Sequence, residues 1–348
     1  MTAPVLPNAL QLAIGRLAHH QPIGATEAAD AFGVIMRGEA TELQVAAMLT
    51  GLRVRGETGE IVAGVVRALR EVMVLLPAER RDELVDTCGT GGGAVQTFNI
   101  STAAALVAAG AGVRVAKHGN RSFTSRCGSA DVLEALGVPL DAPLETMAAS
   151  LRNAGIVFMF APVMHPAMKH VGPVRRELAI PTVMNVVGPL ANPAGATRQV
   201  VGVADPGRVD TLAAALSELG ARHALILHGE PGLDEVSPLG PTRVLEIRSD
   251  RADEWTIDPE KYGYRGLSAA DLAGGDPAEN ARIILEVLGG RGSPAAQAAV
   301  VLNAAAAIYV SGRVAGFADG VAQARRSLES GAGLTALELL RAAYRSSS

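Results

Sequence analysis

Residues 84–119, which read LVDTCGTGGGAVQTFNISTAAALVAAGAGVRVAKHG, decide the fold. A short apolar run at 84–88 is followed by a glycine-rich turn, an alanine-rich stretch at 101–109 and a second apolar run at 113–116. Short runs bounded by turn residues predict strands, and the longer stretch between them predicts a helix. This segment therefore predicts a strand–helix–strand unit of an α/β sheet.

The sequence beyond this unit alternates in the same way between short apolar runs and helical stretches. Helical spacing alone returns from Pro277 onward, and the last helical stretch is expected at residues 334–345. This alternation predicts that the sheet continues well past the middle of the chain. Further strands are expected at residues 156–160, 199–203, 224–228 and 244–248.

The N-terminal part of the chain has a different pattern. Its apolar residues recur at helical spacing, and Thr41 with Gln44 three residues later forms a capping box. Nothing in it resembles a strand. We therefore predict a small all-helical domain over residues 1–75 and an α/β domain over residues 76–348.

The composition excludes several classes of function. With 348 residues, 49% of them hydrophobic and 19% charged, the chain is typical of a globular protein with a sizeable core. A formal net charge of −4 provides no general basic field for nucleic acid or an anionic membrane, so any phosphate site must be local. The alanine-rich stretches at 103–113 and 298–310 are shorter than the ~20 residues of a membrane span, and we expect buried helices there.

The cysteines and the N-terminal segment favour a cytoplasmic location. Cys88 and Cys127 form no CxxC pair and belong to no metal-ligand cluster, as is typical of a reducing compartment. The first 20 residues lack the basic start, apolar stretch and cleavage site of a signal peptide, so secretion is not expected.

The turn between the first strand and its helix is a candidate phosphate site. Gly89, Gly91, Gly92 and Gly93 allow positive φ angles and can turn main-chain N–H groups toward an anion. The helix is expected to open at 99–102, where amide and hydroxyl side chains would cap it and add donors beside its positive end. The alternative is an ordinary tight strand-to-helix loop.

Two nucleotide-binding motifs compete with this interpretation. Gly89, Gly91 and Ala94 match G-x-G-x-x-A, but the helix opens several residues too late for a dinucleotide fingerprint. The second strand ends at Lys117 and His118 instead of the acidic residue that holds a ribose hydroxyl, so we reject NAD and disfavour NADP. No Gly-Lys-Ser/Thr follows the glycines, which excludes a Walker loop.

A second polar segment, residues 117–137, follows the second strand. Lys117, His118, Arg121 and Arg126 place cationic or donor groups at the strand end, the edge where α/β sheets bind ligands. A solvated loop is the alternative. Within the same segment, Ser129 is expected to cap a helix that Gly137 ends.

Two further segments carry charged residues that suit substrate binding. Asp234 and Glu235, in a Gly/Pro-rich loop at 228–238, offer the carboxylate oxygens that hard divalent cations prefer, although adjacent acids in loops are usually just solvated. Arg175 or Arg176 could form a bidentate pair with a substrate carboxylate, or could be surface charge.

The motifs together resemble the anthranilate phosphoribosyltransferase family of tryptophan biosynthesis over nearly the whole chain. The shared strings are GTGG, TFNIST, KHGNRS, GSADVLEALG, HPAMKHVGPVRREL, NVVGPLANPA and HGEPGLDE. The resemblance implies a nucleoside-phosphorylase-like architecture, in which the larger domain has a central mixed, mostly parallel sheet flanked by helices. It also implies that the small helical domain, joined in space by a stretch near 164–190, mediates homodimerisation.

The resemblance implies a site for each reactant and for Mg²⁺. The donor, 5-phosphoribosyl 1-pyrophosphate (PRPP), would contact Gly89, Gly92, Gly93, Thr97, Asn99, Ile100, Ser101, Thr102, Lys117, His118, Gly119, Asn120, Arg121, Ser122, Phe123, Thr124, Ser125 and Ser129. Anthranilate would contact Gly89, Asn120 and Arg175, with His118 as a neighbour. The metal ligands would be Ser101, Asp234 and Glu235.

The chain departs from the family pattern at a few positions of these loops. The usual GTGGD has Gly93 in place of its aspartate, so a carboxylate that helps to order the donor and Mg²⁺ is missing. Thr124, Arg126 and Cys127 differ from the commoner SSKSG form, and Arg126 keeps the positive charge.

The implied reaction displaces pyrophosphate from the anomeric carbon of PRPP by the amine of anthranilate. Because an arylamine is already neutral at pH 7, we nominate no general base.

Two alternative functions stay open. A pyrimidine nucleoside phosphorylase is related in fold, although its signature loops are not found here. A non-catalytic nucleic-acid-binding relative should have a basic face and lack the acidic pair, whereas this chain keeps Asp234 and Glu235.

Overall fold

The structure, a computed structural model, describes residues 6–122, 126–249 and 251–345. It divides into two compact units. The first comprises Met1–Val74, Met164–Ala191 and Asp210–Gly220, and the second Leu75–Val163, Asn192–Val209 and Ala221–Ser348.

The first unit contains only helices among its described residues. Thr41 is the N-cap of the third helix, and its capping box with Gln44 is present as predicted, with bonds of 3.0 and 3.3 Å. Its elements are α1 (Ala9–Ala18), α2 (Ala25–Met36), α3 (Glu42–Arg55), α4 (Gly59–Val72), η2 (Pro166–His170), α9 (Gly172–Leu178), α10 (Met184–Val187), η3 (Gly188–Leu190) and most of α11 (Val209–Glu218).

Two later segments of the chain are tied to α4 within this unit. The Arg70 guanidinium donates to the Leu190 carbonyl at 2.7 Å, and Arg67 forms an ion pair with Glu218 at 2.7 Å. Helix α2 can approach α4 closely because Gly64 has no side chain, since a Cβ there would overlap the Ala25 carbonyl oxygen.

The second unit is built on a seven-stranded mixed sheet of order β3-β2-β1-β4-β5-β6-β7. The first five strands in this order run parallel, and β6 and β7 are added antiparallel. The predicted α/β class is thus confirmed. The strands are β1 (Val85–Gly89), β2 (Val115–Gly119), β3 (Ile156–Phe160), β4 (Arg198–Gly202), β5 (His223–Gly229), β6 (Thr242–Arg248) and β7 (Arg251–Ile257).

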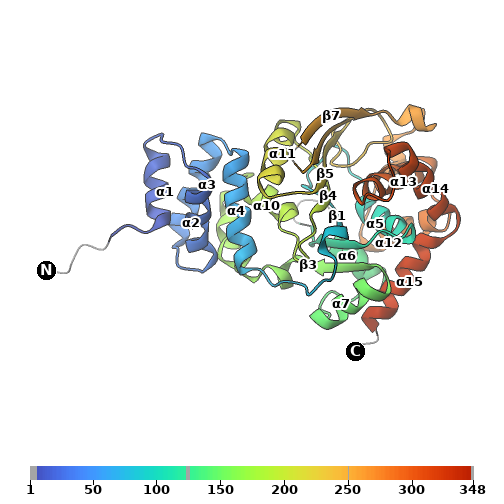
Figure 1. The fold of residues 1–348 in the computed structure, drawn as a ribbon, viewed down its shortest axis with the longest axis horizontal. Coiled ribbons are helices and arrows are strands. Elements are labelled where there is room, and N and C mark those ends of the chain that lie inside the picture. The colour runs from blue at the N-terminus through green and yellow to red at the C-terminus, as the bar shows by residue number, and fades with distance from the viewer. Residues whose placement is uncertain (1–5, 123–125, 250, 346–348) are drawn as a thin grey trace. The chain divides into compact units, whose positions relative to one another are not determined.

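Helices of this unit pack against the sheet: α5 contacts β1 and β2, α13 contacts β1, β4 and β5, and α7 and α15 contact β3 (Figure 1). Helices α5, α13, α14 and α15 pack against one another, and α7 packs on β3 and α15. The helices are α5 (Ile100–Gly110), α6 (Ser129–Ala135), α7 (Leu144–Asn153), α8 (Ala161–Met164, its last residue in the first unit), α12 (Pro277–Leu288), α13 (Pro294–Val310), α14 (Phe317–Glu329) and α15 (Ala332–Arg345), with short 3₁₀ turns η1 (Arg81–Glu83), η4 (Pro206–Arg208), η5 (Pro259–Tyr262) and η6 (Ala269–Leu272).

The predicted strands all form, with ends shifted by up to three residues, but β7 was not predicted. Its sequence RADEWTI is mostly polar, and only its last residue is buried. Strand β7 is instead defined by pairing with β6, from Thr242 opposite Ile257 to Arg248 opposite Arg251. Such an edge strand has too little apolar alternation for a sequence pattern to reveal.

The two alanine-rich stretches are buried helices, as predicted. In α13, 15 of 17 residues are buried, and α5 is buried over most of its length. Small side chains let these helices pack closely, as at Gly333 of α15, where a Cβ would lie 3.2 Å from a Val107 methyl group of α5. No helix in the described ranges is both long enough and apolar enough to cross a membrane.

Candidate functional site

The candidate site lies at the carboxyl edge of the parallel strands in the second unit. Strand β1 pairs in parallel with both β2 and β4, and β4 pairs in parallel with β5. The glycine turn after β1, the polar loop after β2 and the acidic loop after β5 therefore leave the sheet at one edge. Three constellations that are far apart in the sequence thus belong to one region.

The glycine turn has the backbone conformation that the sequence predicts. Gly91 and Gly92 have φ angles of +72° and +81°, and both are exposed. A Cβ at Gly89 would overlap Oδ2 of Asp234, and a Cβ at Gly93 would lie 2.9 Å from a carbonyl oxygen of the acidic loop. The turn therefore packs directly against the acidic loop, and two of its glycines permit that approach.

The acidic pair is half-buried in this loop. The Gly91 N–H donates to Asp234 Oδ2 at 2.8 Å, and burial raises the pKa of Asp234. Burial, followed by the neighbouring Asp234 charge, raises the pKa of Glu235 to about 8, although Lys117 and the Ser101 main-chain N–H oppose the shift. Gly202, at the end of β4, was not singled out from the sequence, yet a Cβ there would overlap the Asp234 carbonyl oxygen.

Lys117 is buried in β2. Its Nζ donates to the Thr87 carbonyl oxygen at 2.6 Å and to Ser101 Oγ at 3.2 Å. Burial lowers the pKa of Lys117, and the nearby Asp86 carboxylate partly offsets this effect. Lys117 thus links the middle of β1 to the first turn of α5 through its hydrogen bonds.

Asp86 and Asn192 support this arrangement, and sequence reasoning missed both. Asp86 is fully buried; it accepts from Asn192 Nδ2 at 2.7 Å and from the His118 main-chain N–H at 3.2 Å. Burial raises the pKa of Asp86 to about 6, against the opposing effects of Lys117 and Asn192. The sequence did contain a signal for Asp86, which is a charged residue inside a predicted strand. Such a residue is rarely buried without a specific partner.

The first turn of α5 departs from the predicted capping. Asn99 occupies the N-cap position, but its side chain makes no capping bond. Asn99 Nδ2 donates to the Cys127 carbonyl oxygen at 3.2 Å, and Asn280 Nδ2 donates to Asn99 Oδ1 at 2.9 Å. The predicted cap is therefore wrong, because tertiary partners hold the amide. The Thr102 hydroxyl is buried and has no hydrogen-bond partner within the described residues.

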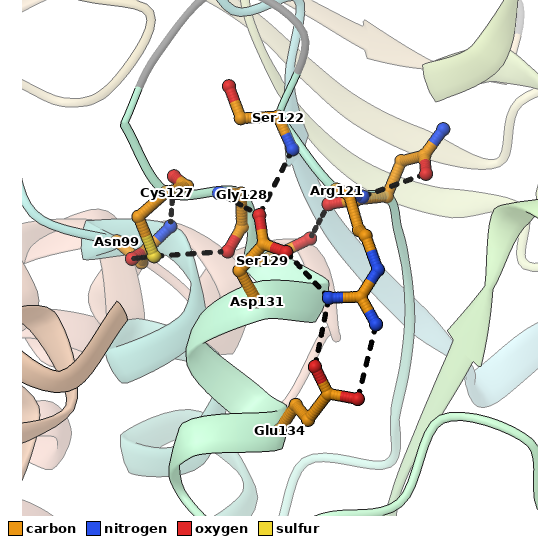
Figure 2. A network of polar contacts seen from close by, with 9 residues as sticks. Asn99, Arg121, Ser122, Cys127, Gly128, Ser129, Asp131 and Glu134 are labelled. Carbon is orange, nitrogen blue, oxygen red and sulfur yellow. Dashed lines mark hydrogen bonds and ion pairs between the residues drawn. The ribbon is translucent and has the colours of Figure 1, made fainter. Parts of the chain in front are cut away.

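The polar loop after β2 is folded around one carboxylate (Figure 2). Asp131 Oδ2 accepts from the main-chain N–H of Gly128 at 2.8 Å and of Ser122 at 3.2 Å. Arg121, a predicted donor contact, forms ion pairs with Asp131 at 2.8 Å and Glu134 at 2.9 Å. The Arg121 guanidinium thus has two carboxylate partners within its own segment.

The predicted cap of α6 is also wrong by one residue. Gly128 is the N-cap, and its main-chain N–H donates to the Asp131 carboxylate. Ser129 is the first helical residue. Ser129 Oγ donates instead to the Asn120 carbonyl oxygen at 3.4 Å. The predicted contacts Phe123, Thr124 and Ser125 lie outside the described residues.

The remaining predicted contacts lie in different surroundings. Thr97, in the loop before α5, and Gly119, the last residue of β2, are half-buried, and Ile100 is buried in α5. Arg175 belongs to the first unit, in α9, where burial lowers the pKa of its guanidinium. Its neighbour Arg176 is exposed.

The acidic loop has the donor chemistry of a magnesium site. The Asp234 and Glu235 carboxylates and the Ser101 hydroxyl are all hard oxygen donors, and burial raises the pKa of both carboxylates, which a bound cation would oppose. No group of three or more His, Cys, Asp or Glu side chains suited to a metal occurs among the described residues. Two carboxylates and one hydroxyl leave room in an octahedral shell for waters and phosphate oxygens, so the residues fit Mg²⁺.

Comparison with protein families assigns both parts of the chain to one class. The glycosyl transferase family a/b domain matches residues 81–334, and the helical bundle domain of the same family matches residues 11–73. The protein is thus a glycosyltransferase with a helical-bundle domain and an α/β domain.

Individual relatives show to which family of glycosyltransferases the chain belongs. The anthranilate phosphoribosyltransferase of Rubrobacter xylanophilus is 49% identical over 329 residues, which cover 94% of this chain and 96% of the relative. The crystal structure of the enzyme from Thermus thermophilus has a TM-score of 0.90 at 42% identity, covering 96% and 99% of the two chains. The Saccharomyces cerevisiae enzyme in complex with PRPP and Mg has a TM-score of 0.88 at 29% identity, covering 97% and 98%. The chain therefore belongs to the anthranilate phosphoribosyltransferase family of pentosyltransferases.

Proposed function

We propose that the protein transfers the phosphoribosyl group of PRPP to the amine of anthranilate, giving N-(5-phosphoribosyl)anthranilate and pyrophosphate in the second step of tryptophan biosynthesis from chorismate. The observation that carries the proposal is the packing of the acidic pair against the glycine turn at one sheet edge. A pyrophosphate with its cation needs hydrogen-bond donors for its anionic oxygens, and these donors must lie beside carboxylates that can bind the metal. This edge of the sheet offers both. The yeast relative in complex with PRPP and Mg supports the choice of donor.

The glycine turn and the start of α5 would bind the pyrophosphate. Main-chain N–H groups of Gly92 and of the first turn of α5, with the hydroxyls of Ser101 and Thr102, are donors for its oxygens. Asp234, Glu235 and Ser101 would hold Mg²⁺, which when bound supplies positive charge to the leaving group. Stabilising the departing anion lowers the barrier to breaking the bond at the anomeric carbon.

Anthranilate would be held by its carboxylate. Arg175 offers a guanidinium for a bidentate pair, and its partial burial strengthens such a pair. Asn120 and His118 are the further predicted neighbours. The enzyme then acts by bringing the neutral arylamine to the anomeric carbon, and no side chain has to remove a proton before attack.

Turnover with purified protein tests this proposal. Anthranilate fluorescence should fall when PRPP and Mg²⁺ are both present and should not fall when either is omitted. Arg175→Ala should raise the KM for anthranilate more than that for PRPP. Absence of turnover, or phosphorolysis of thymidine or uridine in its place, would contradict the proposed reaction.

We also propose that residues 1–75, with the stretch at 164–190, form a dimerisation domain and that residues 76–348 form the PRPP-binding domain. Large apolar side chains are exposed on helices of the first unit: Leu12 on α1 is 56% exposed, and Leu43 and Val54 on α3 are 84% and 77% exposed. Exposed apolar side chains on neighbouring helices suit an interface with a second copy.

Sedimentation of the protein tests the dimer. Leu43→Asp combined with Val54→Asp should convert a dimer into monomers at micromolar concentration, because two charges would be placed in an apolar interface. Leu339→Asp in α15, where the leucine is 46% exposed, is the control and should leave the dimer intact. A monomeric wild-type protein would contradict this proposal without affecting the proposed reaction.

A further inference from the structure

Asn303 is a buried amide in a helix made almost entirely of apolar residues. It lies in α13, is 3% exposed, and is followed by four alanines. A side-chain amide is rarely kept in such surroundings unless specific groups need its hydrogen bonds, because burying it without partners is costly. Its partners therefore indicate why the position is polar.

The partners of Asn303 lie next to the acidic pair. The Val236 N–H donates to Asn303 Oδ1 at 2.8 Å, and Asn303 Nδ2 donates to the Val236 carbonyl oxygen at 2.9 Å. Nδ2 also donates to the Ala299 carbonyl oxygen at 2.9 Å, one turn earlier in α13. Both main-chain polar groups of Val236, a residue with no exposed surface, are thus satisfied by one side chain.

The acidic pair is held from both sides by these contacts. On one side, Asp234 packs on Gly89 and Gly202, where no side chain intervenes. On the other side, Asn303 fixes the main chain directly after Glu235. The direction in which two adjacent carboxylates point depends on the main-chain dihedral angles between these two anchors.

We propose that Asn303 is a positioning residue of the metal site. By bonding both polar groups of Val236, it holds the acidic loop so that Asp234 and Glu235 present their oxygens to Mg²⁺ together. This inference rests on the proposed function and assigns to α13 a role that no sequence motif indicated. Residues that orient metal ligands typically change metal affinity by about 10- to 100-fold when they are replaced.

The test compares Asn303→Leu with Ser327→Ala. Asn303→Leu preserves volume and removes the amide. Ser327→Ala is a matched control: Ser327 is also buried, and its Oγ donates to the Val107 carbonyl oxygen at 2.7 Å, away from the acidic loop. The Mg²⁺ concentration for half-maximal turnover should rise about 10-fold or more in Asn303→Leu and stay within about 2-fold in Ser327→Ala. The kcat at saturating Mg²⁺ should stay within about 3-fold of the wild type in both.

A binding measurement separates positioning from a general loss of activity. With PRPP present and anthranilate absent, the Mg²⁺ concentration that gives half of the metal-induced rise in thermal midpoint should increase about 10-fold in Asn303→Leu alone. If Asn303→Leu does not fold, Asn303→Ser replaces it and should give a shift in the same direction.

The outcomes distinguish the two proposals. Unchanged Mg²⁺ dependence in a folded Asn303 variant, or an equal shift in Ser327→Ala, would overturn the positioning role while wild-type turnover upholds the proposed function. A wild-type protein without turnover or PRPP binding would overturn both.

Discussion

The second unit carries two acidic sites with opposite electrostatic character, one half-buried in the loop after β5 and one buried on β6. At the carboxyl edge of the parallel strands, burial and the adjacent Asp234 raise the pKa of Glu235 to about 8. On the antiparallel strand β6, burial alone would also raise the pKa of Glu246, but hydrogen bonds from His223, Arg248 and Tyr309 outweigh it and lower the pKa to about 2.

The difference lies in the number of donors around each carboxylate. Glu246 accepts from His223 Nε2 at 2.8 Å, Arg248 Nε at 2.6 Å and Trp255 Nε1 at 2.9 Å, with the Tyr309 hydroxyl at 3.4 Å. A buried carboxylate surrounded by donors stabilises the fold, whereas a pair with few donors costs stability and suits a cation that binds later. We therefore interpret Glu246 as structural and the Asp234–Glu235 pair as functional.

The largest effect is expected when the acidic pair is neutralised. Asp234→Asn with Glu235→Gln should reduce turnover by about 10³-fold, because the charge that would hold Mg²⁺ is lost. The thermal midpoint should not fall, since burial already disfavours both charges. Fluorescence-based turnover and thermal unfolding measure the two quantities. Near-normal turnover would contradict the interpretation of the Asp234–Glu235 pair as functional.

A smaller loss is expected when the acidic pair is displaced without loss of charge. Gly89→Ala should reduce turnover by about 10²-fold, because the added Cβ would overlap Oδ2 of Asp234. Gly15→Ala in α1 is the control. A Cβ there would meet nothing within 4 Å, so a change of about 3-fold or less in turnover is expected. Equal effects of the two variants would show that the loop does not depend on the approach at Gly89.

The structural half of the comparison is tested by Glu246→Gln. This variant should lower the free energy of unfolding by about 2 kcal/mol, because charged hydrogen bonds are replaced and their donors stay in place. The free energy of unfolding is measured by urea denaturation, monitored through the fluorescence of Trp255, the single tryptophan of the sequence. Glu254→Gln on β7, where the side chain is 55% exposed, should change it by less than about 0.5 kcal/mol. Turnover of both variants should match the wild type at 25 °C.

The smallest effect is a pH dependence of that stability difference. The pKa of Glu246 is lowered in the folded protein from its ordinary value of 4.5, so its contribution is fully present above that value and is lost as the pH falls toward about 2. The difference between wild type and Glu246→Gln should therefore shrink by about 1 kcal/mol from about pH 5 to about pH 3. A difference that grows as the pH falls would contradict the lowered pKa.

Local patterns predicted most of the fold and part of the site. The glycine turn could be recognised because positive φ angles favour glycine at particular positions, and Gly91 and Gly92 have such angles. Capping was predictable for Thr41, whose partner is three residues away, but not for Asn99, whose amide is held by Cys127 and Asn280. Local rules fail where a distant group offers a better hydrogen bond.

The sequence by itself determined the helical N-terminal region, the strand–helix–strand unit and the residue types of the proposed phosphate and magnesium site, because apolar periodicity and glycine preference act over a few residues. Only the tertiary structure decided which of these groups meet. Asp234 lies against Gly89 and Gly202, and Asn303 holds Val236, because parallel strands far apart in the chain end at one sheet edge and α13 packs beside it. The same long-range packing surrounds Glu246 with donors and leaves Glu235 with few.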